Sequence, residues 1–145
     1  MIYWFTGQPC AGKTVLSKRL HSHLKKKPFL IDGDDLRELT TNKDYSINGR
    51  VNNVNTAQKI AHYLHNQGRD VIVALVAPYV DQREDFKKLI GVENIVEFYV
   101  HTSEPRERDH FKAIAYIPPI SDYVDIDTTN NTEEESFEII KKWIQ

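Results

Sequence analysis

The sequence predicts an α/β domain with three layers, in which a mostly parallel central sheet of four to five strands carries helices on both faces. Short apolar runs alternate with segments of helical periodicity, the pattern of parallel strands joined by crossover helices. The 145 residues fit one domain, and the apolar share of 40% is ordinary for a globular protein. No repeat or linker divides the chain, so we expect a single domain over residues 1–145.

The elements of the first half follow from apolar runs and helical spacing. Residues 2–5 form an apolar run that predicts the first strand, and a glycine-containing turn follows it. Leucines at every fourth position predict a helix over about 13–26. A second strand is expected at 29–31. A longer helix is expected over about 50–66, with Gly68 at the place of a C-terminal cap.

The second half repeats the alternation. The continuous apolar run at 71–76 predicts a strand covered on both faces, which Pro78 ends because proline cannot donate to a ladder. A short helix over 82–90, a strand at 95–100 and a helical segment over about 104–112 follow.

The end of the chain is expected to be irregular over 113–127, with an edge strand near 123–126. A capping box of Thr132 and Glu135 predicts the start of the last helix.

Charge and cysteine content narrow the class of protein. The net charge of −2 lacks the basic surplus of most nucleic-acid binders. A single cysteine, Cys10, excludes an intrachain disulfide and favours a reducing compartment. The apolar N-terminus is too short to span a bilayer and has no basic start of a signal peptide. We expect a cytoplasmic protein that binds neither nucleic acid nor membrane, and a homodimer is left open.

A phosphate-binding motif follows the first strand. It matches G-x-x-x-x-G-K-[ST] at every fixed position and reads Gly7-Gln8-Pro9-Cys10-Ala11-Gly12-Lys13-Thr14. Glycines let the backbone approach phosphate oxygens closely, and the start of the following helix attracts anions. Lys13 can reach the β- and γ-phosphates, and Thr14 can bind Mg²⁺. The motif predicts an ATP-binding P-loop and the P-loop NTPase fold.

A P-loop kinase also needs a carboxylate near Mg²⁺ and a group that orients the acceptor hydroxyl. The third expected strand ends without an acidic residue, whereas Asp32, Asp34 and Asp35 follow the second strand. Ligands gather at the carboxyl ends of strands, so this cluster is a candidate to face the γ-phosphate. The alternative is that the aspartates cap a helix. Arg37 and Arg50 can clamp a second anion or form surface ion pairs.

Over about residues 1–112 the chain resembles the adenylyl-sulfate kinase family, with a weaker similarity to about Thr128. Members of that family use MgATP to phosphorylate the 3′-hydroxyl of adenosine 5′-phosphosulfate (APS). Several blocks occur in the family's order. They are the phosphate loop, Ile31-Asp32-Gly33-Asp34-Asp35-Leu36-Arg37, Arg50-Val51-Asn52-Asn53-Val54, residues 66–74, Ala77-Pro78-Tyr79 with Arg83, and Arg108-Asp109.

The resemblance implies a role for each matching position. The catalytic residues would be Lys13, Asp32 and Asp34, with Asp34 as the proton acceptor. ATP would contact the phosphate loop and Arg108, and Mg²⁺ would contact Thr14 and Asp32, directly or through water. The acceptor would contact Asp34, Arg37, Arg50, Asn53, Val76, Ala77 and Lys112.

The chain also departs from the family's pattern. Ala77 replaces a serine, Asn55 replaces an arginine near the expected acceptor site, and the lid, about residues 109–122, is much shorter. Phe111 and Tyr116 are candidates to replace the phenylalanine that stacks on the acceptor adenine. Two alternatives therefore stay open: a kinase for another small hydroxyl acceptor, such as a nucleoside, nucleotide or sugar, and a nucleotide-binding module without transfer activity.

Overall fold

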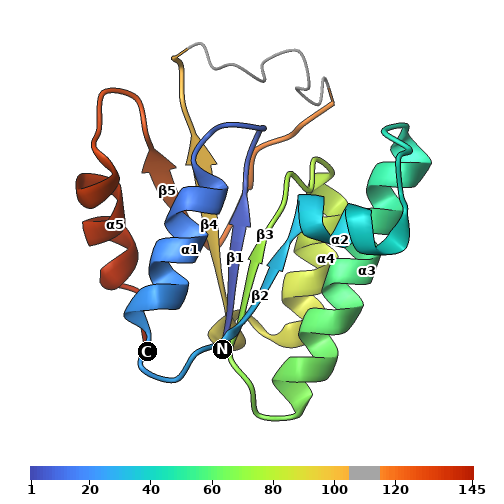
Figure 1. Ribbon diagram of the computed structural model, residues 1–145, viewed down its shortest axis with the longest axis horizontal. Helices are drawn as coiled ribbons and strands as arrows, with labels where there is room; N and C mark the ends of the chain where they lie inside the picture. The colour runs from blue at the N-terminus through green and yellow to red at the C-terminus, as the bar shows by residue number, and fades with distance from the viewer. Residues whose placement is uncertain (105–114) are drawn as a thin grey trace.

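The protein folds around a five-stranded sheet with the strand order β2-β3-β1-β4-β5. Every neighbouring pair of strands is parallel. The computed structural model describes residues 1–104 and 115–145. The strands are β1 (Ile2–Thr6), β2 (Phe29–Asp32), β3 (Val71–Ala74), β4 (Ile95–His101) and β5 (Tyr123–Asp127). Their carboxyl ends lie together at one end of the molecule, and both chain termini lie at the other (Figure 1).

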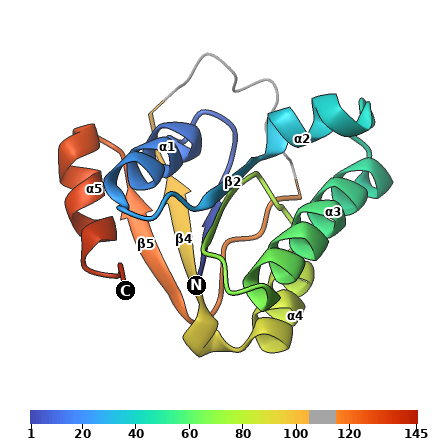
Figure 2. The same cartoon turned by 60° about the horizontal axis from the view of Figure 1, so that its bottom comes forward.

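Helices cover both faces of this sheet. They are α1 (Lys13–His23), α2 (Gly33–Thr40), α3 (Ile47–Asn66), α4 (Val80–Ile90) and α5 (Glu133–Lys141), with a 3₁₀ turn, η1, at Val92–Asn94. Helices α1 and α5 pack on one face, and α3 and α4 pack on the other (Figure 2). This arrangement confirms the three predicted layers.

The residues of β1 divide between two hydrophobic cores. Ile2 and Trp4 belong to the core beneath α3 and α4, whereas Tyr3 and Phe5 belong to the core beneath α1 and α5. All four side chains are at most 2% exposed. Successive residues of a strand point to opposite faces, so a strand covered on both faces must be apolar at every position.

Helix α2 is an element that the sequence analysis missed. It starts directly after β2, and the side chain of Asp32 caps it by accepting hydrogen bonds from the backbone amides of Asp34 and Asp35. The capping alternative is therefore confirmed for Asp32. Strand β3 also ends at Ala74, earlier than predicted, because the chain turns away from the sheet toward Ala77, which has a φ of 45°.

The predictions of an edge strand and of a capping box near the end of the chain are confirmed. The edge strand β5 lies where it was expected, and the capping box of Thr132 and Glu135 starts α5. The helix predicted over about 104–112 lies almost wholly outside the described residues. Within the described part of the chain, no helix has the length and apolar character needed to cross a membrane.

Candidate functional site

The phosphate loop connects β1 to α1 at the carboxyl end of the sheet. Gly7 has a φ of 149°, and a Cβ built there would lie 2.0 Å from the carbonyl oxygen of Val100. Only glycine fits this position. Gly12, with a φ of 114°, is the N-cap of α1, and no described side chain caps the helix. The first amides of α1 are therefore directed toward the loop, as an anion-binding helix N-terminus requires.

The side chains that end the motif connect the loop to the end of β2. Lys13 donates from Nζ to the carbonyl oxygen of Gln8 at 2.7 Å, so its ammonium group lies against the loop. Thr14 donates from Oγ1 to Oδ2 of Asp32 at 3.2 Å. The other carboxylate oxygen, Oδ1, accepts the backbone amide of Asp34 at 3.0 Å. Asp32 thus serves both as the helix cap and as the carboxylate beside the phosphate loop.

The donor set at this point suits a hard cation. A hydroxyl and a carboxylate are ligands that Mg²⁺ prefers, and this ion usually completes its shell with phosphate oxygens and water. Among the residues that the structure describes, no group of three or more His, Cys, Asp or Glu side chains could hold a metal ion. Thr14 and Asp32 would supply one hydroxyl and one carboxylate to an ion bound together with a nucleotide.

One pocket joins the phosphate loop to the ends of β2 and β3. Most of the predicted site residues line it, namely Pro9, Cys10, Lys13, Thr14, Asp32, Asp34, Arg37, Arg50, Asn53, Val76 and Ala77. The remaining loop residues, Gly7, Gln8, Ala11 and Gly12, lie in the same turn without lining the pocket. The structure thus brings the expected donor and acceptor groups into one cavity, with cationic and anionic side chains on its wall.

Tyr45 is a pocket residue that the sequence analysis missed. Its ring centre lies 4.0 Å from Cζ of Arg37 and 5.6 Å from Cζ of Arg50. Arg37 donates from Nη1 to the carbonyl oxygens of Asn42 and Asp44, and Arg50 donates from Nε to that of Tyr45 at 2.9 Å. Burial lowers the pKa of Arg37. The two arginines therefore hold the loop that carries the ring. In the sequence, the one signal that could have indicated Tyr45 is an aromatic residue between these two arginines.

Asn53 lines the pocket and carries an unpaired polar atom. The residue is only 6% exposed, and its Oδ1 is buried without a hydrogen-bond partner among the described residues. A buried polar atom without a partner costs free energy, which makes Asn53 a candidate to receive a hydrogen bond from a ligand.

The substitution at Asn55 lies elsewhere. Its Oδ1 accepts a hydrogen bond from Nε2 of Gln82 on α4 at 2.8 Å, and the residue does not line the pocket. The effect of this substitution on the acceptor site stays a prediction. The side chain of Asn55 belongs to the contact between α3 and α4.

The far wall of the pocket is the turn after β3. Ala77 is 1% exposed and has a φ of 45°, a left-handed conformation that is strained for a residue with a Cβ. Its carbonyl oxygen accepts a hydrogen bond from Arg83, and that of Val76 accepts one from Thr6 at 2.8 Å. Strained backbone of this kind is often found at ligand sites.

The remaining candidates lie away from this pocket or outside the described residues. Tyr116 donates or accepts at Oγ1 of Thr6 at 3.0 Å, and its ring packs on Arg83 and Tyr99. Burial raises the pKa of Tyr116. The ring does not line the pocket, so the structure does not place it where an acceptor base would stack. Arg108, Phe111 and Lys112 lie outside the described residues, and their roles stay predictions.

A parallel sheet whose β1 leads through a glycine-rich loop into α1 defines the class of P-loop nucleotide-binding proteins. The second set of polar side chains in the same pocket is the arrangement expected of a P-loop kinase. The family model described as adenylylsulphate kinase matches residues 1–114. The chain belongs to the adenylylsulphate kinase family.

A sequence relative agrees with this assignment, and a solved structure shares the fold. The adenylyl-sulfate kinase of Pseudomonas aeruginosa is 39% identical over 114 residues, which cover 74% of this chain and 58% of the relative. The match thus spans less than two-thirds of that protein. The structure of the Mycobacterium tuberculosis APS kinase in complex with AMPPNP and APS has a TM-score of 0.74 at 21% identity, covering 97% of this chain and 95% of that chain.

The fold is also shared with a kinase of another name. A sugar kinase from Janibacter sp. has a TM-score of 0.71 at 13% identity, covering 98% of this chain and 92% of that chain. Similarity of fold alone therefore does not identify the acceptor, which has to be argued from the site.

Proposed function

We propose that the protein transfers the γ-phosphoryl group of ATP to the 3′-hydroxyl of APS, which gives 3′-phosphoadenosine 5′-phosphosulfate and ADP. The observation that carries this proposal is the shared pocket, in which a phosphate loop stands beside Arg37, Arg50 and the unpaired Oδ1 of Asn53. Membership of the adenylylsulphate kinase family supports APS as the acceptor.

On the donor side, the loop amides and Lys13 bind the β- and γ-phosphates of ATP. Charge develops on the transferred oxygens during phosphoryl transfer, and fixed donors that face those oxygens lower the barrier. Thr14 and Asp32 are the residues that would hold Mg²⁺, directly or through water. When bound, the ion would neutralise part of the negative charge of the phosphates.

On the acceptor side, Arg37 and Arg50 offer positive charge to the phosphosulfate, and the ring of Tyr45 offers a flat surface for the base. Asp34 lines the pocket next to the phosphate loop and accepts the proton of the 3′-hydroxyl. A bond forms between the 3′-oxygen and the γ-phosphorus while the bond from that phosphorus to the β-bridging oxygen breaks, and ADP leaves.

The first alternative is a kinase for a different hydroxyl acceptor, which would use the same phosphate loop and carboxylates and differ only in its acceptor contacts. A non-catalytic nucleotide-binding module explains the site less well, because Lys13, Thr14 and Asp32 are all present and in place. The cytoplasmic location and the homodimer stay predictions from the sequence. Size-exclusion chromatography with light scattering tests the dimer.

The direct test is turnover of MgATP by the purified protein with APS, beside adenosine, AMP, a hexose and a no-acceptor control. We expect ADP formation to depend on APS and the product to carry a new phosphate on the 3′-oxygen, as identified by ³¹P NMR. Faster transfer to another acceptor would support the alternative kinase. ATP binding without transfer to any of these compounds would support the non-catalytic module.

A further inference from the structure

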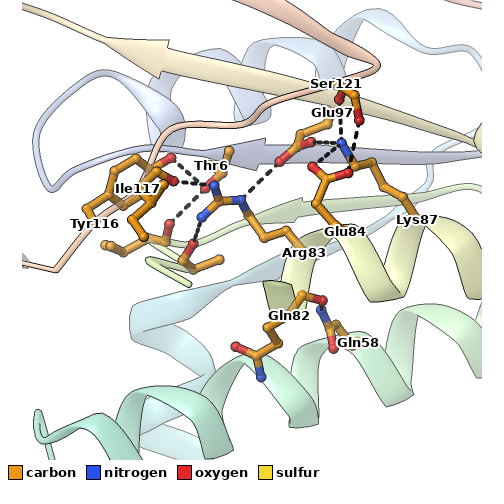
Figure 3. A network of polar contacts seen from close by, with 12 residues as sticks. Thr6, Gln58, Gln82, Arg83, Glu84, Lys87, Glu97, Tyr116, Ile117 and Ser121 are labelled. Carbon is orange, nitrogen blue, oxygen red and sulfur yellow. Dashed lines mark hydrogen bonds and ion pairs between the residues drawn. The ribbon is translucent and has the colours of Figure 1, made fainter. Parts of the chain in front are cut away.

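A cluster of buried charges lies between α4 and β4, behind the wall formed by Ala77. Arg83 Nε lies 3.2 Å from Oε1 of Glu97, and Lys87 Nζ lies 2.6 Å from Oε2 of the same carboxylate. Lys87 also pairs with Glu84 at 2.8 Å. Arg83 and Glu97 are each 2% exposed, and Lys87 is 3% exposed. Figure 3 shows the arrangement.

Stability alone does not explain such a cluster. Taking charges out of water costs several kcal/mol per ion, so buried ion pairs are often no better for stability than apolar residues of similar size. Burial raises the pKa of Glu97, although the hydrogen bond and charge of Lys87 and the charge of Arg83 oppose that shift. The carboxylate is therefore held in its place at a cost, which suggests a role in fixing geometry.

The contacts that Arg83 makes with residues other than Glu97 show which parts of the chain it holds in place. Its Nη1 donates to the carbonyl oxygen of Ala77, and its Nη2 donates to that of Ile117 (Figure 3). The ring of Tyr116 covers the guanidinium, with its centre 5.2 Å from Cζ. A single guanidinium group thus connects β4 through Glu97, the turn after β3, and the chain at Tyr116 and Ile117.

Three successive carbonyl oxygens of the turn after β3, those of residues 76–78, accept hydrogen bonds. Val76 accepts from the hydroxyl of Thr6 at 2.8 Å, Ala77 accepts from Arg83, and Pro78 accepts from the backbone amide of Ile117 at 3.0 Å. The strained φ of Ala77 needs such support, because an unusual backbone conformation persists only where its surroundings determine it. Arg83 itself donates the hydrogen bond to Ala77. Because it also donates to the carbonyl oxygen of Ile117, it supports the bond from the Ile117 amide to Pro78.

We propose that Arg83 is a positioning residue that fixes the wall at residues 76–78 for the acceptor. It does so from behind the wall and without touching the substrate. The identity of the acceptor rests on the proposed function, but the mechanical role of Arg83 does not. A planar guanidinium can hold a carboxylate and two carbonyl oxygens in fixed directions, whereas the ammonium of a lysine cannot form this fork.

The test compares Arg83→Lys with Lys87→Met. The first variant keeps a positive charge beside Glu97 but loses the fork, and the second disturbs the same buried cluster without a contact to residues 76–78. For Arg83→Lys we expect the KM for APS to rise about tenfold and the KM for ATP to stay within about twofold, since small misplacements of a bound substrate are costly. The Lys87→Met variant should melt at a lower temperature, with both KM values within about twofold of wild type.

Hydrogen exchange of the Ile117 amide gives a second measurement that does not depend on the acceptor. Loss of the fork should make this amide exchange about tenfold faster in Arg83→Lys, because its bond to Pro78 opens more often. Unchanged exchange, or equal increases of both KM values, would overturn the proposal. If wild type transfers nothing to APS, the proposed function fails, and the exchange of Ile117 still decides the role of Arg83.

Discussion

The two sides of the pocket are built in different ways. The donor side is a continuous stretch, residues 7–14, whose shape depends on backbone conformation and on the amides at the start of α1. The acceptor side is assembled from α2, the start of α3 and the turn after β3, which lie far apart along the chain. The donor side therefore depends mainly on glycine, and the acceptor side on hydrogen bonds from side chains to backbone carbonyls.

This difference indicates where the chain can change its chemistry. A phosphate loop tolerates little variation, since a Cβ at Gly7 would collide with the backbone of β4. The acceptor wall is held through backbone carbonyls such as that of Ala77, so we expect it to accept side-chain substitutions that keep these hydrogen bonds. We expect variants of the donor side to abolish transfer and variants of the acceptor side to change affinity for the acceptor.

The largest effect is expected for Lys13→Ala. Loss of a fixed cation that faces the transferred phosphoryl group should lower kcat about a thousandfold, in the range found for removal of one transition-state donor. Lys18→Ala is the matched control, because Lys18 is an exposed residue of the same helix. Assays of ADP formation, quenched at fixed times, measure kcat for both variants. If Lys13→Ala kept near-normal turnover, the phosphate loop would not be the donor site.

The next effect is expected for Asp34→Asn. Removing the proton acceptor should lower kcat about a hundredfold or more, while the Kd for ATP changes by less than about threefold. Asp35→Asn is the control, since Asp35 is its exposed neighbour and does not line the pocket. A similar loss in both variants would assign the effect to the charge of the cluster and not to proton transfer by Asp34.

A smaller effect is expected for Asn53→Ala on the acceptor side. The loss of its unpaired Oδ1 should raise the KM for APS about tenfold, the effect of one hydrogen bond in a buried site, and leave the KM for ATP unchanged. Asn52→Ala, at an exposed position of the same helix, should behave as wild type. An equal rise of both KM values would show that Asn53 supports the pocket as a whole.

The smallest effect concerns acid stability. Hydrogen bonds from Ser46 hold the pKa of Asp44 below its ordinary value of 3.8, with the charge of Arg37 contributing. A lowered pKa in the folded state adds stability above the ordinary pKa, and this stability is lost as the pH falls through the lowered value. Asp44→Asn should therefore melt slightly below wild type at pH 7, and the difference should disappear as the pH falls through the lowered pKa of Asp44. A difference independent of pH would exclude this origin.

The difference between the donor side and the acceptor side also explains which site residues could be predicted from the sequence. The donor side was predictable because its groups are contiguous and their spacing is dictated by the phosphate. Asp32 was predicted to be either a helix cap or a catalytic neighbour of the phosphates. The structure confirms the cap and shows that the same carboxylate accepts a hydrogen bond from Thr14 of the phosphate loop, and its catalytic role stays a prediction. Tyr45 was missed because no periodicity marks a residue held by two arginines. The contact of Asn55 with Gln82 could not be predicted, because it forms only when α3 packs on α4.

The hydrogen bonds that hold the acceptor wall at residues 76–78 also could not be predicted from the sequence. The contact between Arg83 and Ile117 joins two residues that are 34 positions apart in the chain, and no local sequence pattern contains such a contact. Buried charges are also recognisable only in the folded state, since the sequence of α4 is that of an ordinary amphipathic helix.

The most direct test of the two-sided pocket is a crystal structure of the protein with ADP, Mg²⁺ and APS. We expect the diphosphate to lie in the loop of residues 7–14, the base of APS beside Tyr45, and its 3′-hydroxyl within hydrogen-bond distance of Asp34. An APS molecule bound away from Arg37, Arg50 and Asn53, or with its 3′-hydroxyl directed away from the phosphate loop, would contradict the account.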